Sequence, residues 1–355
     1  MGKGLNSNTA KWDVDVRAQL VDALNRSALA DDSRYERLPA FVRFRATGAA
    51  RAWESWRRIV EKGQNNVSEM LRTRPIVSLV NQFDELARQL LPYGTAEMSP
   101  DEAGTVSAHS ALWQAFELRN GTIFEPTPPL HRLLDDAYIS DDVPIGAVEL
   151  PADTLCIIPE PSSWGKGERS DATIFFKKDQ TLSCVTWVMR IHEGQRYATV
   201  DVVELPLDKP EQTIGALLDD VCGSSETYHT LLRTYLRESI DYAVKMLLYL
   251  KARDAHVVRE RAYSDAPRSF SGLGQRKRTE RMAEIEMLYD RHLVGPAILD
   301  SEGSRPESDG SNGHEMSVHW RRPHFRMQPH GPQASLRKLV FIGPTIVRPD
   351  RLGLA

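Results

Sequence analysis

The chain has 355 residues, of which 41% are hydrophobic and 26% are charged, and its formal net charge is −4. This composition is typical of a folded protein, and the length suits two domains of about 100–200 residues each. The longest apolar stretch is much shorter than the ~20 residues of a membrane-spanning helix. Three scattered cysteines form neither a disulfide framework nor a zinc quartet. We therefore expect a cytoplasmic protein with no membrane partner.

The first third of the chain has the pattern of helices. Apolar residues recur there at helical spacing, and the stripe that follows Pro75 stops at Pro92-Tyr93-Gly94. After residue 122 the pattern changes to β-branched and aromatic runs that are broken by Pro, Gly and Asp. The sequence therefore predicts an α+β protein, with a helical N-terminal region at 1–122 and an α+β domain at 123–355.

The second region is predicted to combine antiparallel strands with a long central helix. Period-two alternation in its first strands places Ile174, Phe176, Val185 and Trp187, or in the other register their neighbours, on one face. The predicted elements, in chain order, are a β meander at 150–206, helices at 213–256, a basic loop at 264–281, a linker at 300–313 and a His/Arg-rich β-hairpin at 316–347.

Positive charge gathers at the C-terminal end. Residues 314–355 contain seven Lys or Arg but two Asp or Glu, together with four of the ten histidines. This segment is therefore formally +5, which leaves −9 for the rest of the chain. Such an asymmetry indicates a polyanionic partner, most simply RNA or another nucleic acid, or else an acidic protein surface. A basic tail that docks on the acidic body of the same chain is the alternative.

The most informative segment is the first strand of the C-terminal hairpin. Strand alternation places Trp320, Arg322, His324 and Arg326 on one face. Pro323 cannot donate a hydrogen bond to a neighbouring strand, so the strand is expected to lie at an edge or to bulge there. A bulge can bring neighbouring histidines toward one site.

Two imidazoles beside guanidinium groups suit metal-independent cleavage of an RNA phosphodiester. One imidazole removes the proton of the 2′-hydroxyl and the other protonates the leaving oxygen, while arginine holds the phosphate. We therefore expect a toxin-like endoribonuclease, in which His319 and His324 are acid and base and Arg322 and Arg326 hold the phosphate. No cofactor is expected. A metal site is not expected either, because the two histidines have no third ligand at a suitable spacing.

Further side chains are expected to contact the nucleic acid beyond this site. An aromatic ring can stack on a base, and cations can follow the phosphate backbone. The alternative is a non-catalytic protein that binds nucleic acid, or that inhibits a phage or host target, through the same basic face. A neutralising or target protein is then a second kind of partner. The predicted nucleic-acid contacts are Arg321, Trp320, His330, Lys277, Arg278 and Arg281.

The C-terminal residues resemble those of a known family. The run His319-Trp320-Arg321-Arg322-Pro323-His324-Phe325-Arg326, followed by His330-Gly331 and by Phe341-Ile342-Gly343-Pro344, is similar to the tail H-W-x-R-G-H-x-R in a family of bacterial, phage and mobile-element proteins. Pro323 stands where that motif has glycine, and the resemblance covers roughly the last third of the chain. It implies a phage or mobile-element setting, in which a toxin, an anti-phage effector and a phage-encoded inhibitor are alternatives.

Overall fold

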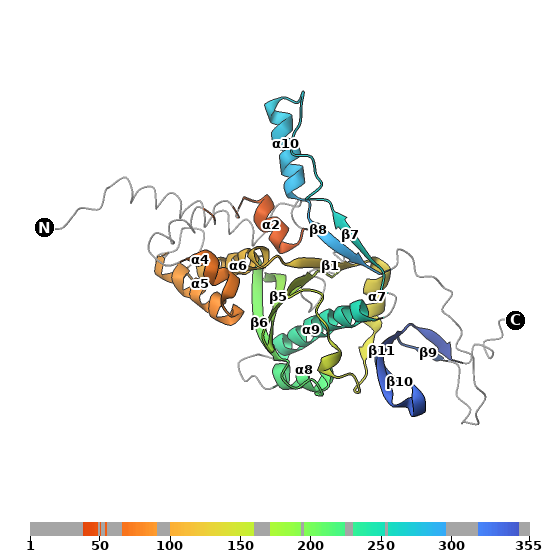
Figure 1. The fold of residues 1–355 in the computed structure, drawn as a ribbon. Coiled ribbons are helices and arrows are strands. Elements are labelled where there is room, and N and C mark those ends of the chain that lie inside the picture. The colour runs from red at the N-terminus through yellow and green to blue at the C-terminus, as the bar shows by residue number, and fades with distance from the viewer. Residues whose placement is uncertain are drawn as a thin grey trace.

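The computed structural model arranges the chain as helices and strands around one large sheet (Figure 1). It describes residues 38–48, 50, 54, 66–90, 100–159, 171–192, 195–223, 230–252, 255–295 and 319–347. The predicted linker at 300–313 lies outside these residues. Within them, no helix combines the length and the apolar character needed to cross a membrane.

The sheet of the described chain has seven strands: β1 (Thr122–Pro126), β3 (Thr154–Ile157), β4 (Ala172–Lys178), β5 (Thr181–His192), β6 (Gln195–Pro206), β7 (Val257–Arg261) and β8 (Asp290–Val294). They lie in the order β6–β5–β4–β3–β1–β8–β7. β1 runs parallel to β3 and β8, and the other neighbouring strands are antiparallel. The predicted meander at 150–206 corresponds to the four consecutive strands from β3 to β6.

Side chains of the meander alternate between two hydrophobic cores, one on each face of the sheet. Ile174, Phe176, Val185 and Trp187 all lie in the first core, as the first of the two predicted registers requires. Phe175, whose side chain points the other way, lies in the second core. Because both faces are buried, these strands read as nearly continuous apolar runs.

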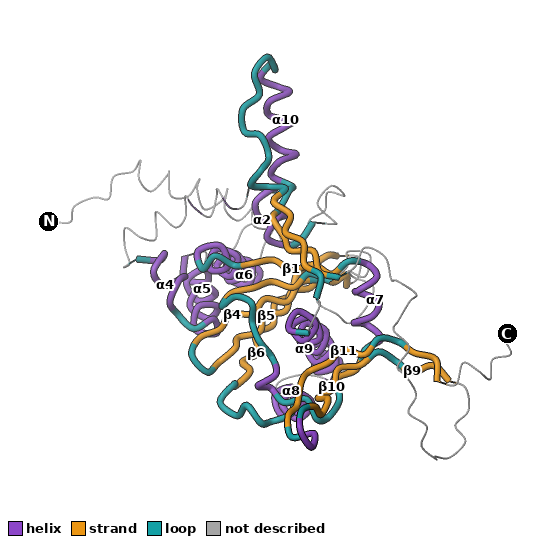
Figure 2. Tube along the Cα trace, turned by 45° about the vertical axis from the view of Figure 1, so that its right-hand side comes forward, coloured by secondary structure: helices purple, strands orange, loops and turns teal. Residues whose placement is uncertain are grey.

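Helices cover both faces of the sheet (Figures 1 and 2). The first core is covered by α2 (Ala40–Ala46), α4 (Val67–Thr73), α5 (Ile76–Leu90) and α6 (Pro100–Leu118). The second is covered by α7 (Pro128–Asp136), α8 (Ile214–Gly223) and α9 (Thr230–Lys251). Short 3₁₀ turns lie at Ile145–Ala147 and Pro332–Ala334. The predicted α+β class is confirmed.

The predicted boundary at residue 122 falls between α6 and β1. Helices before the boundary share a core with strands after it: the rings of Trp113 in α6 and Trp187 in β5 lie 5.1 Å apart. The N-terminal helices therefore pack on the same sheet that the second region forms, and the division into two domains stays a prediction.

The last strands form a β-ribbon beside the second core. Its strands are β9 (His319–Arg321), β10 (His324–His330), β11 (Leu336–Ile342) and β12 (Thr345–Val347). β10 is antiparallel to β11, and β9 is antiparallel to β12. The short strand β2 (Tyr138–Ile139) pairs in parallel with the start of β10. We call residues 319–347 the ribbon.

A helical projection leaves the sheet at its β7–β8 end. It consists of residues 262–289, which join these two strands and include α10 (Gln275–Glu286). In both views the projection extends away from the body of the protein (Figures 1 and 2). We call residues 262–289 the arm. A helix of this length spans about 18 Å.

Candidate nucleic-acid interface

The predicted C-terminal hairpin is present, with an interruption at Arg322-Pro323. On one side of it β10 pairs with β11, beginning at His324 opposite Ile342, and on the other side β9 pairs with β12. Pro323 has no N–H to offer, but its carbonyl accepts a hydrogen bond of 3.2 Å from the backbone N–H of Tyr138. The break expected from this proline therefore lies where β2 joins the ribbon.

His324 is buried at this junction. Only 1% of the residue is exposed, and its imidazole stacks on the Tyr138 ring at 5.1 Å between centroids, with 9° between the planes. Its Nδ1 lies 3.2 Å from the carbonyl oxygen of Arg322, while its Nε2 has no hydrogen-bond partner among the described residues. The imidazole that was expected to exchange protons with RNA is therefore closed off from solvent.

Electrostatics keep this imidazole uncharged. Burial, the largest cause, lowers the pKa of His324, although the hydrogen bond to the Arg322 carbonyl acts in the opposite direction. The positive charges of Arg321 and Arg326 lower the pKa further, which places both guanidinium groups in the electrostatic neighbourhood of the ring. The ring is therefore predominantly neutral at pH 7.

The other predicted residues of the ribbon differ in exposure. Arg321 and Arg322 are exposed, whereas Arg326 and His330 are half-buried. The Nε of Arg326 and the Nδ1 of His330 have no hydrogen-bond partner in the described structure. His319 and Trp320 belong to β9, but their side chains lie outside what the structure describes. Arg321 and Arg326 thus act electrostatically on His324, and the backbone carbonyl of Arg322 contacts its ring. The pairing of His319 with His324 stays a prediction.

Tyr138 lies beside the predicted residues of the ribbon, although the sequence did not indicate it as part of the site. It is 45% exposed and comes to the ribbon through the parallel pairing of β2 with β10. Its local sequence offers no signal, because β2 has two residues and its partner strand follows far along the chain. Only the long-range pairing reveals the contact.

The three remaining residues that were predicted to contact nucleic acid lie on the arm. Residues 275–281, predicted as part of a basic loop, form the first half of α10, because Gln, Arg, Lys and Glu are good helix formers. Lys277, Arg278 and Arg281 are all exposed. Figures 1 and 2 show the arm and the ribbon at different ends of the molecule, so they form two separate basic surfaces.

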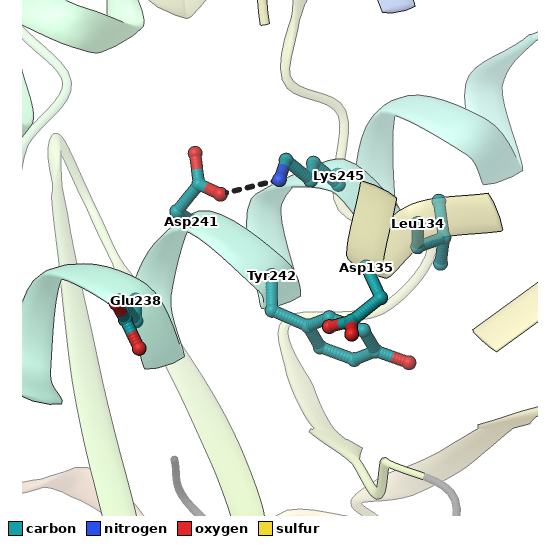
Figure 3. Close-up of a pocket in the computed structure, with 6 residues that line it drawn as sticks. All are labelled: Leu134, Asp135, Glu238, Asp241, Tyr242 and Lys245. Atoms are coloured by element: carbon teal, nitrogen blue, oxygen red, sulfur yellow. Dashed lines mark ion pairs between the residues drawn. The ribbon is translucent and has the colours of Figure 1, made fainter. Parts of the chain in front are cut away.

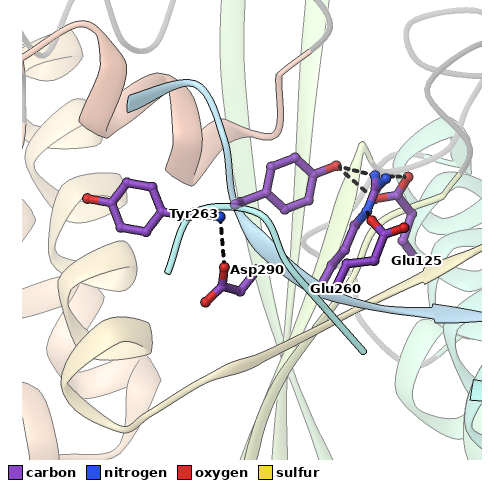
Figure 4. Close-up of polar contacts among 6 residues, drawn as sticks. Glu125, Glu260, Tyr263 and Asp290 are labelled. Carbon is purple, nitrogen blue, oxygen red and sulfur yellow. Dashed lines mark hydrogen bonds and ion pairs between the residues drawn. The ribbon is translucent and has the colours of Figure 1, made fainter. Parts of the chain in front are cut away.

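The base of the arm is held by a polar network (Figure 4). Arg291 in β8 donates to Glu125 in β1 at 2.8 Å and to Glu260 in β7 at 2.9 Å. The hydroxyl of Tyr289 also donates to Glu125, at 2.7 Å. Asp290 accepts hydrogen bonds of 2.9 Å from the backbone N–H groups of Tyr263 and Ser264. Three adjacent strands are therefore tied together where the arm begins.

A second set of contacts joins the arm to α2. The guanidinium of Arg45 lies 3.7 Å from the centre of the Tyr263 ring and forms a 3.1 Å ion pair with Glu286. It also donates to the carbonyl of Leu288. Arg268 approaches the same tyrosine ring, at 4.3 Å. These contacts fix the base of the arm on the body of the protein.

A pocket of about 200 Å³ lies between α7 and α9 (Figure 3). Lys245 is buried there and forms a 2.7 Å ion pair with Asp241, one turn earlier on α9. With three carboxylates around one ammonium group, the pocket disfavours phosphate. Its lining residues are Leu134, Asp135, Glu238, Asp241, Tyr242 and Lys245. Among the residues that the structure describes, those of this pocket included, no group of three or more His, Cys, Asp or Glu side chains could hold a metal ion.

One comparison with known proteins, the scan against family models, identifies a family. The model of the AcrVA2-like family, described as the anti-CRISPR type V subtype A2 family, matches residues 124–349. The crystal structure of AcrVA2 aligns with 93% of this chain and 98% of that chain, at 13% sequence identity and a TM-score of 0.35. No curated protein matches this chain.

This family match decides between the functions that the sequence left open. An anti-CRISPR family is one of phage inhibitor proteins, so the predicted toxin-like endoribonuclease, with its hydrolase chemistry on RNA, is wrong. The alternative of a phage-encoded inhibitor is the one that the match supports, and the expected phage or mobile-element setting agrees with it. Because the matched residues make up well over half of the chain, the protein belongs to the AcrVA2-like, anti-CRISPR type V subtype A2 family.

Proposed function

We propose that this protein inhibits a type V CRISPR–Cas system by binding RNA of that system, without cleaving it, through the basic tip of the arm. CRISPR effectors depend on a guide RNA whose backbone they hold by charge and shape. A protein that occupies that backbone competes with the effector. The observation that carries the proposal is the exposed cluster of cations on the arm.

The tip of the arm concentrates positive charge. Residues 266–281 contain five Lys or Arg and one acidic residue, Glu280, so the tip is formally +4 within a chain of net charge −4. Every side chain from Gln275 to Arg281 is exposed. Cations placed in this way can reach phosphates and release the counterions that RNA carries.

Two of these arginines already have carboxylate partners within α10. Arg276 pairs with Glu280 at 2.9 Å and Arg281 with Glu284 at 2.6 Å, and all four side chains are more than half exposed. Exposed pairs of this kind contribute about 0–1 kcal/mol. Both arginines can therefore exchange a carboxylate for a phosphate at little cost.

The base of the arm supports binding in another way. Arg291 and Arg45 hold it to β1, β7 and α2, so the position of the tip is set before a partner arrives. Preorganisation lowers the entropic cost of association. A projecting helix with a fixed base and a charged tip suits insertion into a groove of folded RNA.

The test compares two variants with equal loss of charge. Lys277→Ala/Arg278→Ala removes two cations from the arm, and Lys177→Ala/Lys209→Ala removes two exposed lysines elsewhere. Affinity for a labelled structured RNA is measured by fluorescence anisotropy between about 50 and 200 mM salt. We expect the arm variant to weaken binding and to lower the slope of log Kd against log salt by about two. The control variant Lys177→Ala/Lys209→Ala should keep the slope of the parent chain.

Inhibition is measured with the same proteins in cells that carry a type V CRISPR system. The arm variant should lose inhibition while it folds like the parent chain, and RNA recovered from the complex should remain intact. An arm variant that binds RNA and inhibits as well as the control refutes the proposal. Inhibition without any RNA binding indicates a protein partner instead.

A further inference from the structure

The ribbon offers a contact of a different chemical kind from the arm. Among the described residues, the large hydrophobic side chains that are exposed are Tyr138, Val257, Val258, Leu288 and Leu336, of which Tyr138 is the aromatic one. An exposed aromatic ring beside arginines is the arrangement with which proteins bind unpaired bases. We propose that Tyr138 is a stacking platform for an unpaired nucleobase, with Arg321 and Arg322 contacting the adjoining phosphates.

The Tyr138 ring is held in place from behind. The imidazole of His324 lies nearly parallel to it, and the His324 residue is 1% exposed while Tyr138 is 45% exposed. The tyrosine ring therefore separates a buried ring from solvent. Since its position is set by packing, a base that stacks on it does not have to order a mobile side chain.

The backbone around Tyr138 is also constrained. Its N–H donates to the carbonyl of Pro323 at 3.2 Å, and the N–H of Ser140 donates to the carbonyl of Phe325 at 3.0 Å. These bonds join β2 to a strand whose Phe325 is fully buried in the second core. The platform is thus attached to the core through two backbone hydrogen bonds to the segment at the start of β10, which is the neighbour of β2 in the sheet.

Charge around the platform favours a base over a phosphate as the group that meets Tyr138. Asp135, Asp136, Asp141 and Asp142 flank it in the sequence, and Asp135 faces the pocket between α7 and α9 (Figure 3). Cations reach the platform from the ribbon, where Arg321 and Arg322 are exposed. Stacking does not depend on net charge, so an uncharged base fits at the ring and the phosphates fit on the ribbon.

This inference rests on the proposed function for the class of ligand, which is RNA. It adds that unpaired bases are the part of the RNA that is recognised at the ribbon. The arm contacts backbone charge, which every RNA carries. The platform distinguishes single-stranded from paired RNA, because bases within a helix have no free face. The two surfaces together fit an RNA that has both a folded part and an unpaired part.

The test removes the base and the ring independently. Binding of a single-stranded RNA of about ten nucleotides, and of the same backbone with abasic sites, is measured for the parent chain, Tyr138→Ala and Tyr138→Phe. We expect Tyr138→Ala to weaken binding of the RNA with bases by about 5- to 150-fold, the range found when stacking aromatics are truncated. Its affinity for the abasic strand should not change. Tyr138→Phe should restore most of the affinity, because phenylalanine keeps the ring.

Leu336→Ala is the matched control, since Leu336 is 53% exposed on the same three-stranded sheet but carries no aromatic ring. Equal losses for both RNAs in Tyr138→Ala, or a loss in Tyr138→Phe as large as in Tyr138→Ala, overturn the inference. Thermal unfolding of each variant checks that the fold is retained.

If the arm variants alone lose RNA binding, the proposed function stands without the platform. If Tyr138→Ala weakens binding of the RNA with bases but not of the abasic strand, while the arm variants bind RNA normally, the platform stands without the arm. A parent chain that binds neither RNA overturns both.

Discussion

The arm and the ribbon are both basic, but they hold their cations differently. The arm carries Lys277, Arg278 and Arg281 on a helix whose first half is wholly exposed, and its buried contacts are confined to its base. The ribbon carries its cations on strands that pack on the second core through Phe325. The positively charged segments of the sequence thus form two different structures. In the arm they form a helix that projects into solvent, and in the ribbon they form strands that pack on the core.

This difference bears on function. An exposed helix tip can approach any phosphate backbone, so the arm suits affinity with little discrimination. Where β2 meets the ribbon, the Tyr138 ring is held against His324, and Arg321 and Arg322 are exposed just before His324 in the chain. This arrangement suits recognition of a particular part of the ligand. Variants that detach each region from its support sharpen the comparison.

The largest effect is expected where the ribbon meets the core. Phe325 is fully buried, with its ring centroid 4.7 Å from that of Phe341, which in turn lies 5.7 Å from Tyr249 of α9. Phe325→Ala should lower the free energy of unfolding by about 3–5 kcal/mol, because it leaves a cavity in a packed core. Urea unfolding measures the loss. Val340→Ala, on a half-buried residue of β11, should cost clearly less. Equal costs would show that the ribbon is not anchored by this ring.

A smaller effect is expected at the base of the arm. Arg291→Met leaves the buried Glu125 carboxylate with Tyr289 as its remaining partner in the network. Removing one partner of a buried pair costs about 3–5 kcal/mol. Arg291 is 28% exposed, so we expect about 2–3 kcal/mol. Arg276→Met is the control, because it breaks a pair whose arginine is 93% exposed and should cost less than about 1 kcal/mol.

The same variant tests whether the arm depends on its fixed base. Arg291→Met leaves every cation of the tip in place, so a loss of RNA affinity without a change in the salt slope indicates lost preorganisation. Unchanged affinity in a destabilised chain would separate the network from binding and leave it a purely structural feature.

Much of the fold could be predicted because it follows local periodicity. The alternation that places Ile174, Val185 and Trp187 on one face is set by the strand itself, and the structure has these side chains in one core. Between Tyr242 and Leu248 every residue except Lys245 is apolar, which predicts burial on several sides of the helix, and all of these residues are buried.

The site was harder to predict because it depends on contacts between distant segments. His324 is a polar residue in a basic strand, which locally suggests exposure, yet it is buried by a two-residue strand from another part of the chain. In the arm, a high density of charge beside glycines suggested a flexible loop. The residues from Gln275 onward form a helix instead, because charged side chains on an exposed helix need no apolar face of their own.

The smallest effect concerns the pH dependence that the buried His324 confers on stability. Burial, the main cause, lowers the pKa of His324 below its ordinary value of 6.5, so the unfolded chain takes up a proton at a pH where the folded chain does not. The stability due to the neutral ring is complete above that ordinary pKa and is lost as the pH falls below it, by up to about 1.4 kcal/mol per pH unit.

His324→Phe keeps a ring against Tyr138 but cannot be protonated. Urea unfolding near neutral pH and at mildly acidic pH should therefore show a smaller loss of stability for this variant than for the parent chain, with other histidines contributing equally to both. Identical losses would mean that His324 is as readily charged in the folded chain as in the unfolded one, and that the ring behind Tyr138 is not sealed from water. A smaller loss in the variant supports a ribbon whose imidazole backs the Tyr138 ring, in contrast to an arm whose cations all face solvent.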